Sequence, residues 1–126
     1  MSLDSIPNID TPDLHATASQ TEKSLSVSFL GNADSRSMAA IDALLTGLHK
    51  EAIATKLREV RIDLRGLEFM NSSCFKAFVT WIGKVQDLPQ PEQYQMIFRS
   101  DDTKHWQRRS LGALSCFAVD LIRIDV

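Results

Sequence analysis

The sequence predicts an α/β domain in which about three helices cover one face of a mixed sheet of about five strands. Five segments alternate apolar and polar residues, as strands with one buried face do. Three segments between them repeat apolar residues at intervals of three and four, as amphipathic helices do. The order is strand, strand, helix, strand, helix, strand, helix, strand. Strands separated by helices favour parallel pairing, so we expect a mixed sheet.

The first residues lack any such pattern. Pro7, Pro12 and several small polar residues without periodicity predict a flexible tail over residues 1–12. A single domain is then expected over residues 13–126, which is long enough to bury a core without metal or disulfide support.

Two strands and a helix follow the tail. Residues 14–20 and 25–30 alternate as strands, and the polar residues 21–24 between them suit a hairpin. Asp34 or Ser35 can cap the next helix, because short polar side chains accept hydrogen bonds from its first N–H groups. The apolar side of this helix is expected to consist of Met38, Ile41, Leu44, Leu45 and Leu48.

The central strand follows that helix, which should end near Lys56. Alternation from Val60 to Leu64 indicates the strand, and Arg65 with Gly66 predicts a break in it. A helix comes next in the chain, as is usual for a strand that crosses over to a parallel neighbour.

The following helix begins with a polar triplet. Asn71, Ser72 and Ser73 can each cap it. Its buried face is expected to hold Phe75, Phe78, Val79, Ile82 and Val85, and its solvated face Lys76, Thr80 and Lys84. Two prolines, Pro89 and Pro91, predict a loop after its end.

The C-terminal part is predicted to form a strand, a short helix and a last strand. The strand spans 94–99, the helix spans about 103–111 with Gly112 as its stop, and the last strand spans 119–124. Val119 and Leu121, with Ile122 as a further candidate, should face inward, while Lys104, His105, Arg108 and Arg109 should form a solvated basic run.

Charge and hydropathy exclude several classes of protein. The net charge of −2 gives no overall attraction to nucleic acid or anionic lipid. The sequence contains no apolar run long enough to span a membrane, and its first residues lack the pattern of a signal peptide. We therefore expect a cytoplasmic protein that contacts neither nucleic acid nor the membrane interior.

Nothing in the sequence predicts an enzyme, a cofactor or a metal site. No nucleophile elbow, P-loop or dinucleotide-binding glycine motif is present, and His15, His49 and His105 have no catalytic partner at a suggestive spacing. Cys74 and Cys116 are too few and too far apart in the sequence for a structural zinc, so we expect reduced, partly buried thiols.

One segment resembles a known family. Residues 63–73, D-L-R-G-L-E-F-M-N-S-S, run directly into an amphipathic helix and resemble the STAS domain, the family of anti-sigma factor antagonists. Gly31 and Asp34 occupy a strand-to-helix turn where the family also has glycine and aspartate. The resemblance covers about residues 14–124 and implies a STAS-like fold, with no counterpart here of the family's last helix.

The resemblance also implies a function. In the family, a serine at the position of Ser72 is phosphorylated by a serine kinase that is also an anti-sigma factor, and a separate phosphatase resets it. Ser73 is the second candidate. The resemblance implies a bacterial regulator whose partner-binding residues are Gly31, Asn32, Asp34, Asp63, Asn71, Ser72, Ser73 and Lys76. We expect a monomer or weak dimer, since the unpaired edge of a small sheet can pair with itself.

Two residues depart from the family pattern and leave other functions open. Asn71 stands where the family has aspartate, and Cys74 stands where it has glycine. One alternative is an unphosphorylated STAS subunit of a lipid or anion transport assembly. The other is a STAS module that senses a small ligand or nucleotide, because helix N-termini bind anions readily.

Overall fold

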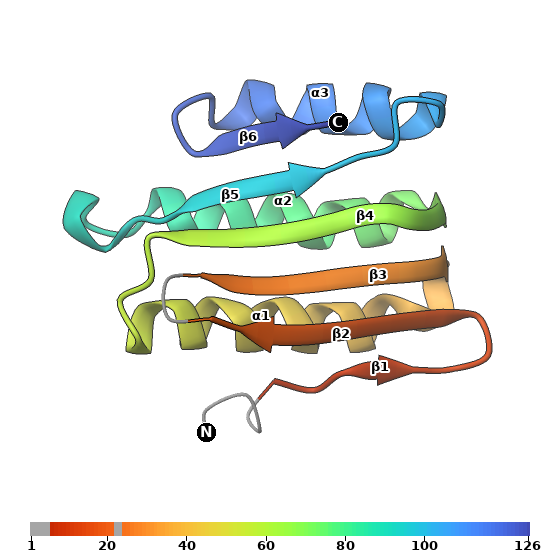
Figure 1. Cartoon of the computed structure of the whole chain (residues 1–126), viewed down its shortest axis with the longest axis horizontal. Coiled ribbons are helices and arrows are strands. Elements are labelled where there is room, and N and C mark those ends of the chain that lie inside the picture. Colours follow the sequence, from red (N-terminus) through yellow and green to blue (C-terminus); the bar gives the residue numbers. More distant parts are fainter. Residues whose placement is uncertain (1–5, 22–23) are drawn as a thin grey trace.

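The computed structural model describes residues 6–21 and 24–126, which form one sheet and three α-helices (Figure 1). The strands are β1 (Ile9–Asp10), β2 (Leu14–Gln20), β3 (Leu25–Ala33), β4 (Glu59–Met70), β5 (Gln95–Arg99) and β6 (Ile122–Asp125). The helices are α1 (Met38–Ala54), α2 (Ser72–Gln86) and α3 (His105–Phe117), with short 3₁₀ turns η2 (Ser35–Ser37) and η3 (Gln90–Glu92). The predicted α/β class is confirmed.

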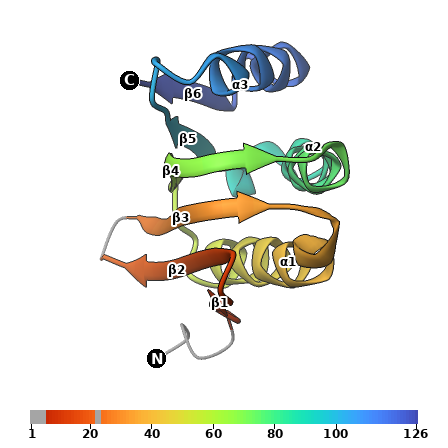
Figure 2. The same ribbon diagram turned by 90° about the vertical axis from the view of Figure 1, so that its right-hand side faces the viewer.

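The six strands lie side by side in chain order. β1, β2 and β3 pair antiparallel, whereas β3, β4, β5 and β6 pair parallel, so the sheet is mixed as expected. Each parallel connection runs through one helix, and all three helices lie on the same face (Figure 2). The opposite face of the sheet carries no helix among the described residues.

The hydrophobic core lies between the sheet and the helices. Val27, Ile62 and Phe98 are neighbours across β3, β4 and β5 and are almost completely buried. α1 contributes Leu44 and Leu48 to the same core. α2 and α3 contribute Phe78, Trp81, Ile82, Leu111 and Leu114. The predicted alternation therefore places apolar residues on the helix-covered side.

The break expected at Arg65 and Gly66 is a bulge within a continuous strand. Between the pairs Ser28–Asp63 and Leu30–Gly66, β4 advances three residues while β3 advances two. Gly66 fits there because a Cβ atom would lie 2.7 Å from Leu30 Cδ1. An extra residue accommodated in this way bends and twists a strand without ending it.

Two polar residues, Gln107 of α3 and Lys104 just before that helix, bind the bulged part of β4. Gln107 is completely buried, and its amide nitrogen donates to the carbonyl oxygens of Leu64 and Leu67. Lys104 Nζ donates to the Arg65 carbonyl oxygen at 3.1 Å and forms an ion pair with Asp101 at 2.9 Å. The prediction that Lys104 is solvated is therefore wrong. The rest of the basic run, His105, Arg108 and Arg109, is exposed as expected.

Part of the predicted N-terminal tail forms a strand instead. Ile9 and Asp10 form β1, which pairs with Ala16 and His15, and the side chains of Ile6 and Ile9 are buried. The structure thus contradicts a tail through Pro12, because the sheet gains an edge strand there. Residues 1–5 of that tail, and residues 22–23 of the predicted hairpin, lie outside the described part.

The C-terminal part also differs from the prediction. α3 continues through Gly112 to Phe117, because burial of Leu111 and Leu114 outweighs the weak helix preference of one glycine. β6 begins only at Ile122, which is 7% exposed, whereas Val119 is 73% exposed. The expected inward position of Val119 is therefore wrong. Within the described residues, no helix combines the length and the apolar character that crossing a membrane requires.

Candidate functional site

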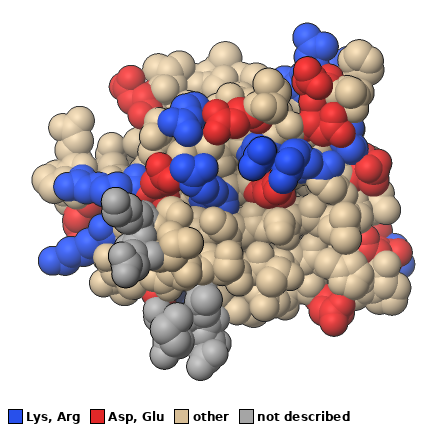
Figure 3. All heavy atoms as spheres, in the orientation of Figure 1, with Lys and Arg blue, Asp and Glu red and all other residues tan. Residues whose placement is uncertain are grey.

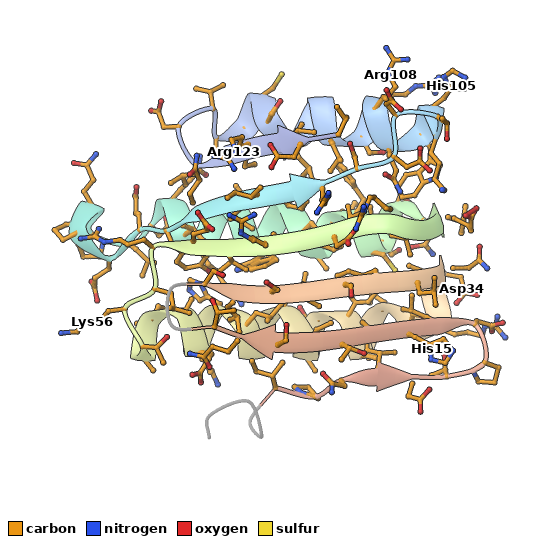
Figure 4. All side chains as sticks on the ribbon, viewed as in Figure 1. His15, Asp34, Lys56, His105, Arg108 and Arg123 are labelled. Carbon is orange, nitrogen blue, oxygen red and sulfur yellow. The ribbon has the colours of Figure 1, made fainter. Side chains whose placement is uncertain are left out.

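The candidate site lies at the end of the sheet where β3 and β4 finish. Ala33 is the last residue of β3, and its carbonyl oxygen accepts a hydrogen bond from the Asn71 N–H at 2.9 Å. This bond holds the turn that leads into α1 beside the first residue of α2. Figure 4 labels Asp34 at this end of β3.

The α2 N-terminus presents the two serines differently. Asn71 caps the helix, since its side-chain oxygen accepts from the Cys74 N–H at 2.9 Å. Ser72 is the first helical residue and is exposed, whereas Ser73 is half-buried. Because Asn71 supplies the cap, the Ser72 hydroxyl is not needed for it and remains open to solvent.

Asp34 is held by a small ion-pair network. Its carboxylate accepts from the Arg36 N–H at 2.9 Å, which caps η2. Arg36 Nη2 lies 2.7 Å from the Asp34 carboxylate and 2.8 Å from the Asp13 carboxylate. The hydrogen bond from the Arg36 side chain is the main reason that the pKa of Asp34 is lowered. Asp34 is therefore a charged residue with a fixed orientation.

Cys74 connects the Asp34 turn to α2. Its side chain is completely buried, and Sγ donates to the Asp34 carbonyl oxygen at 3.3 Å. Burial raises the pKa of the Cys74 thiol, so the reactive thiolate is disfavoured. The expectation of partly buried thiols is wrong for Cys116, which is exposed.

Gly31 has a structural role in this arrangement. Its φ of 111° lies in the region that favours glycine, and a Cβ atom would collide with the Asp13 carbonyl oxygen. The next residue, Asn32, donates its N–H to the same oxygen at 2.8 Å while the residue as a whole stays exposed. Asn32 is thus available at the surface, whereas Gly31 shapes the backbone.

Lys76 lies one turn after Ser72 and is exposed at a shallow hollow between α1 and α2. The hollow has a volume of about 380 Å³ and is lined by Met38, Ala39, Asp42, Ser73, Lys76, Ala77 and Thr80. Met38 is 45% exposed, although sequence periodicity placed it on the buried side of its helix. It is the first residue of α1, where the side of the helix that is buried further along is still exposed.

A second exposed apolar residue belongs to the same end of the sheet. Phe69 is 48% exposed and pairs in register with Asn32 of β3. Its place beside Met70 at the strand terminus was the only signal for it in the sequence. Phe69 and Met38 thus add apolar surface to a site that the sequence described only through polar residues.

Asp63 does not join the other predicted site residues. It lies seven positions before Met70 on β4, pairs in register with Ser28, and forms an ion pair with Arg65 at 2.9 Å. The hydrogen bond from Arg65 is the main cause of its lowered pKa. The structure therefore places Asp63 on the helix-free face, whereas Gly31, Asn32, Asp34, Asn71, Ser72, Ser73 and Lys76 lie at or near the end of the sheet where β3 and β4 finish.

The site shows no constellation for metal binding. Over residues 6–21 and 24–126, no three His, Cys, Asp or Glu side chains come together as possible metal ligands. The site offers instead an exposed hydroxyl at a helix start, a fixed carboxylate and apolar side chains.

Comparison with known proteins gives a likeness of fold. No family model matches the chain, and no curated protein sequence matches it. The crystal structure of an anti-sigma factor antagonist from Mycobacterium paratuberculosis is similar, with a TM-score of 0.64 and 14% sequence identity. The match covers 93% of this chain and 90% of that chain. At this identity the likeness concerns the fold alone.

Proposed function

We propose, from the premise that this chain has the STAS-like fold of an anti-sigma factor antagonist, that it is a non-enzymatic regulator controlled at Ser72. Its partner would be a serine kinase that also acts as an anti-sigma factor, with a serine phosphatase to reset it. The setting would be bacterial signal transduction in the cytoplasm that ends in transcription control, with the chain a monomer or weak dimer. Exposure of Ser72 at the start of α2 is the observation that supports this function best.

A phosphate at this position would leave the fold intact. Phosphorylation of serine adds about −1.5 to −2 charges near neutral pH. Negative charge at a helix N-terminus is favourable by about 0.3–1 kcal/mol, because the first N–H groups point toward it. Ser72 does not belong to the core, whereas Cys74, two residues later, is completely buried. The modification would therefore act at the surface.

The same phosphate would oppose partner binding. A partner that covers Ser72 in a dry interface must desolvate the phosphate, at a cost of several kcal/mol unless a cation meets it. Since about 1.4 kcal/mol corresponds to a tenfold change in affinity, binding would be switched off. Lys76 is exposed one turn further along α2 and too solvated to neutralise a dianion completely.

The surface around Ser72 suits a protein partner. Exposed Met38 lines the same hollow as Lys76, and exposed Phe69 pairs in register with Asn32, so apolar side chains lie beside polar ones here. An apolar centre with a polar rim is the common arrangement of protein interfaces. Asp34, oriented by Arg36, would fix the docking direction.

Incubation with ATP and the serine kinase encoded by a neighbouring gene tests this function. We expect one phosphate on wild type, located at Ser72 by mass spectrometry, and none on Ser72→Ala. Ser73→Ala and the α3 variant Ser110→Ala serve as matched controls and should be phosphorylated like wild type. Absence of phosphate on wild type, together with no binding of the kinase by wild type or Ser72→Ala, would exclude this function and favour an unphosphorylated STAS module.

A further inference from the structure

The helix-free face of the sheet is divided into two chemically different halves. Figure 3 shows charged side chains across the upper part of this face, over β4 to β6, and mainly uncharged surface below them. Register places two rows of outward residues across the strands. One row is Ser19, Ser26, Arg61, Ile97 and Arg123. The next row is Thr17, Ser28, Asp63, Arg99 and Asp125.

A hollow of about 200 Å³ lies where these rows meet. Its floor includes Ile97, which is only 2% exposed although no helix covers this face within the described chain. Ile97 lies between Arg61 and Arg123 in register, so the stems of these long side chains can shield it. Charged side chains therefore form walls around an apolar floor, and the hollow can hold a small molecule.

One guanidinium at the hollow, that of Arg99, has no carboxylate partner among the described residues. Three carboxylates each pair with an arginine of their own strand: Glu59 with Arg61 at 2.8 Å, Asp63 with Arg65 at 2.9 Å, and Asp125 with Arg123 at 3.3 Å. Arg99 has no hydrogen bond or ion pair from its side chain within the described residues, and its neighbours in register are Asp63 and Asp125. Of these seven residues only Arg61, Asp63, Arg99 and Asp125 line the hollow, so its lining is neutral overall, and Arg99 is the guanidinium there that has no carboxylate partner within the described residues.

The opposite wall of the hollow offers hydroxyl groups. Ser26 and Ser28 of β3 line it, and neither hydroxyl has a hydrogen-bond partner among the residues described. They lie two strands from β5, which corresponds to roughly 10 Å from the line of Arg99. Hydroxyls both donate and accept hydrogen bonds, so this wall suits an uncharged, hydroxyl-bearing part of a ligand.

We infer that this hollow binds a small polyhydroxy carboxylate. The carboxylate lies against Arg99, whose planar guanidinium matches it with two parallel hydrogen bonds. The hydroxyl-bearing carbons extend over Ile97 toward Ser26 and Ser28. Asp63 and Asp125, on either side of Arg99, repel a single negative charge less than they repel a phosphate dianion, so a monocarboxylate is favoured.

This site is separate from the Ser72 surface. It uses the middle of the helix-free face, while Ser72 lies at the start of α2, on the other side of the core. Failure of one proposal therefore leaves the other standing. Of the residues that the STAS resemblance named as partner-binding, only Asp63 lines the hollow.

Titration of the ¹⁵N-labelled full chain with gluconate tests the inference by nuclear magnetic resonance. We expect saturable shifts at the amides of Ser28, Ile97 and Arg99, with weak or no shifts for sorbitol, acetate and inorganic phosphate. Arg99→Gln should weaken gluconate binding about tenfold or more, because a charge-assisted hydrogen-bond pair is lost. Arg109→Gln, which removes an exposed arginine of α3, should bind like wild type.

Other outcomes overturn the inference. Absence of saturable shifts with gluconate, equal binding of acetate or phosphate, or unchanged binding by Arg99→Gln would each contradict it. If Arg99→Gln loses stability, the pair Ser26→Ala and Ser28→Ala provides the second measurement. The double variant should bind gluconate more weakly and respond to acetate as wild type does. Unaltered gluconate binding by the double variant would rule out the predicted orientation.

Discussion

The Cys74 thiol donates a hydrogen bond to the Asp34 carbonyl oxygen at 3.3 Å, which joins the start of α2 to the turn before α1. The two residues are forty positions apart in the chain and belong to different crossovers. Where the STAS resemblance leads one to expect glycine, a buried side chain thus fastens the two segments that surround Ser72. The site is therefore built on a rigid support.

Removing this side chain should destabilise the domain, whereas truncating the second cysteine should not. Cys74→Ala leaves a small cavity and removes one of the two hydrogen bonds that the Asp34 carbonyl oxygen accepts, the other being from the Ser37 N–H, so we expect a loss of about 1–2 kcal/mol in the free energy of unfolding. Urea denaturation measures it, and Cys116→Ala, at an exposed position, should change stability by less than about 0.5 kcal/mol. A cost at Cys74 no larger than that at Cys116 would contradict its role as a link.

The two thiols should also differ in reactivity. A thiol reagent should modify Cys116 in the native protein, whereas Cys74 should react only after unfolding, because it is buried and its pKa is raised by that burial. Counting modified cysteines by mass spectrometry before and after denaturation checks this. Rapid native labelling of Cys74 would show that the start of α2 opens readily.

Asn71 should be needed as a helix cap and replaceable by aspartate. Asn71→Ala removes the hydrogen bond to the Cys74 N–H and should cost about 1 kcal/mol. Asn71→Asp keeps the cap and adds a favourable charge at the helix start, so its stability should equal or slightly exceed that of wild type. Chemical denaturation of both variants, with Asn32→Ala as a surface control, separates capping from simple loss of an amide.

Gly31 should tolerate no side chain. Gly31→Ala would drive a Cβ atom into the Asp13 carbonyl oxygen at a φ of 111°, so we expect a loss of more than about 1 kcal/mol. Gly83 lies in α2, where a Cβ atom would meet nothing within 4 Å, and Gly83→Ala should be stabilising by roughly 0.5–1 kcal/mol. Thermal unfolding should therefore shift in opposite directions for the two variants.

Stability should fall in mild acid because of His49. Its Nδ1 lies at hydrogen-bonding distance, 2.6 Å, from the Tyr94 hydroxyl, which also accepts a hydrogen bond from Trp81 Nε1 at 2.7 Å. Burial, with a smaller effect of Lys84, lowers the pKa of His49 below its ordinary value of 6.5.

The sign of the effect follows from proton binding. The unfolded chain binds a proton at His49 below pH 6.5 while the folded chain resists it, so stability rises with pH in that range. The contribution is complete above pH 6.5 and is lost as the pH falls from 6.5 through the folded pKa. Urea midpoints measured from about pH 7.5 to about pH 5 should decline for wild type and decline less for His49→Gln. Parallel curves for both proteins would contradict the assignment.

Much of the fold could be predicted because periodicity reports burial. Alternation located β2 to β5, and three-and-four spacing located the helices, since those patterns reflect which face meets the core. The boundaries of α3 and β6 were harder to predict from the sequence. Gly112 is typical of a helix stop in the sequence, but packing of its neighbours carries α3 onward.

The residues that escaped prediction depend on contacts distant in the chain. Gln107 and Lys104 look like solvated helix residues, yet both bind carbonyl oxygens of the β4 bulge. Their role becomes visible only in the structure, because β5 ends at Arg99 opposite Asp63 while β4 continues to Met70 without a β5 partner, and the two residues bind carbonyl oxygens of that continuation. Likewise, Asp63 is the first residue of the STAS-like motif in the sequence. In the structure it lies on the helix-free face, away from Ser72.

Titration calorimetry tests the central claim most directly. It measures binding of the serine kinase encoded by a neighbouring gene to wild type, Ser72→Ala and Ser72→Asp, and urea denaturation measures the stability of the same three proteins. We expect all three to unfold within about 0.5 kcal/mol of one another, because position 72 is exposed. Wild type and Ser72→Ala should bind alike, and Ser72→Asp should bind at least tenfold more weakly. Equal binding by Ser72→Asp and Ser72→Ala, with both folded, would contradict control by charge at this helix start.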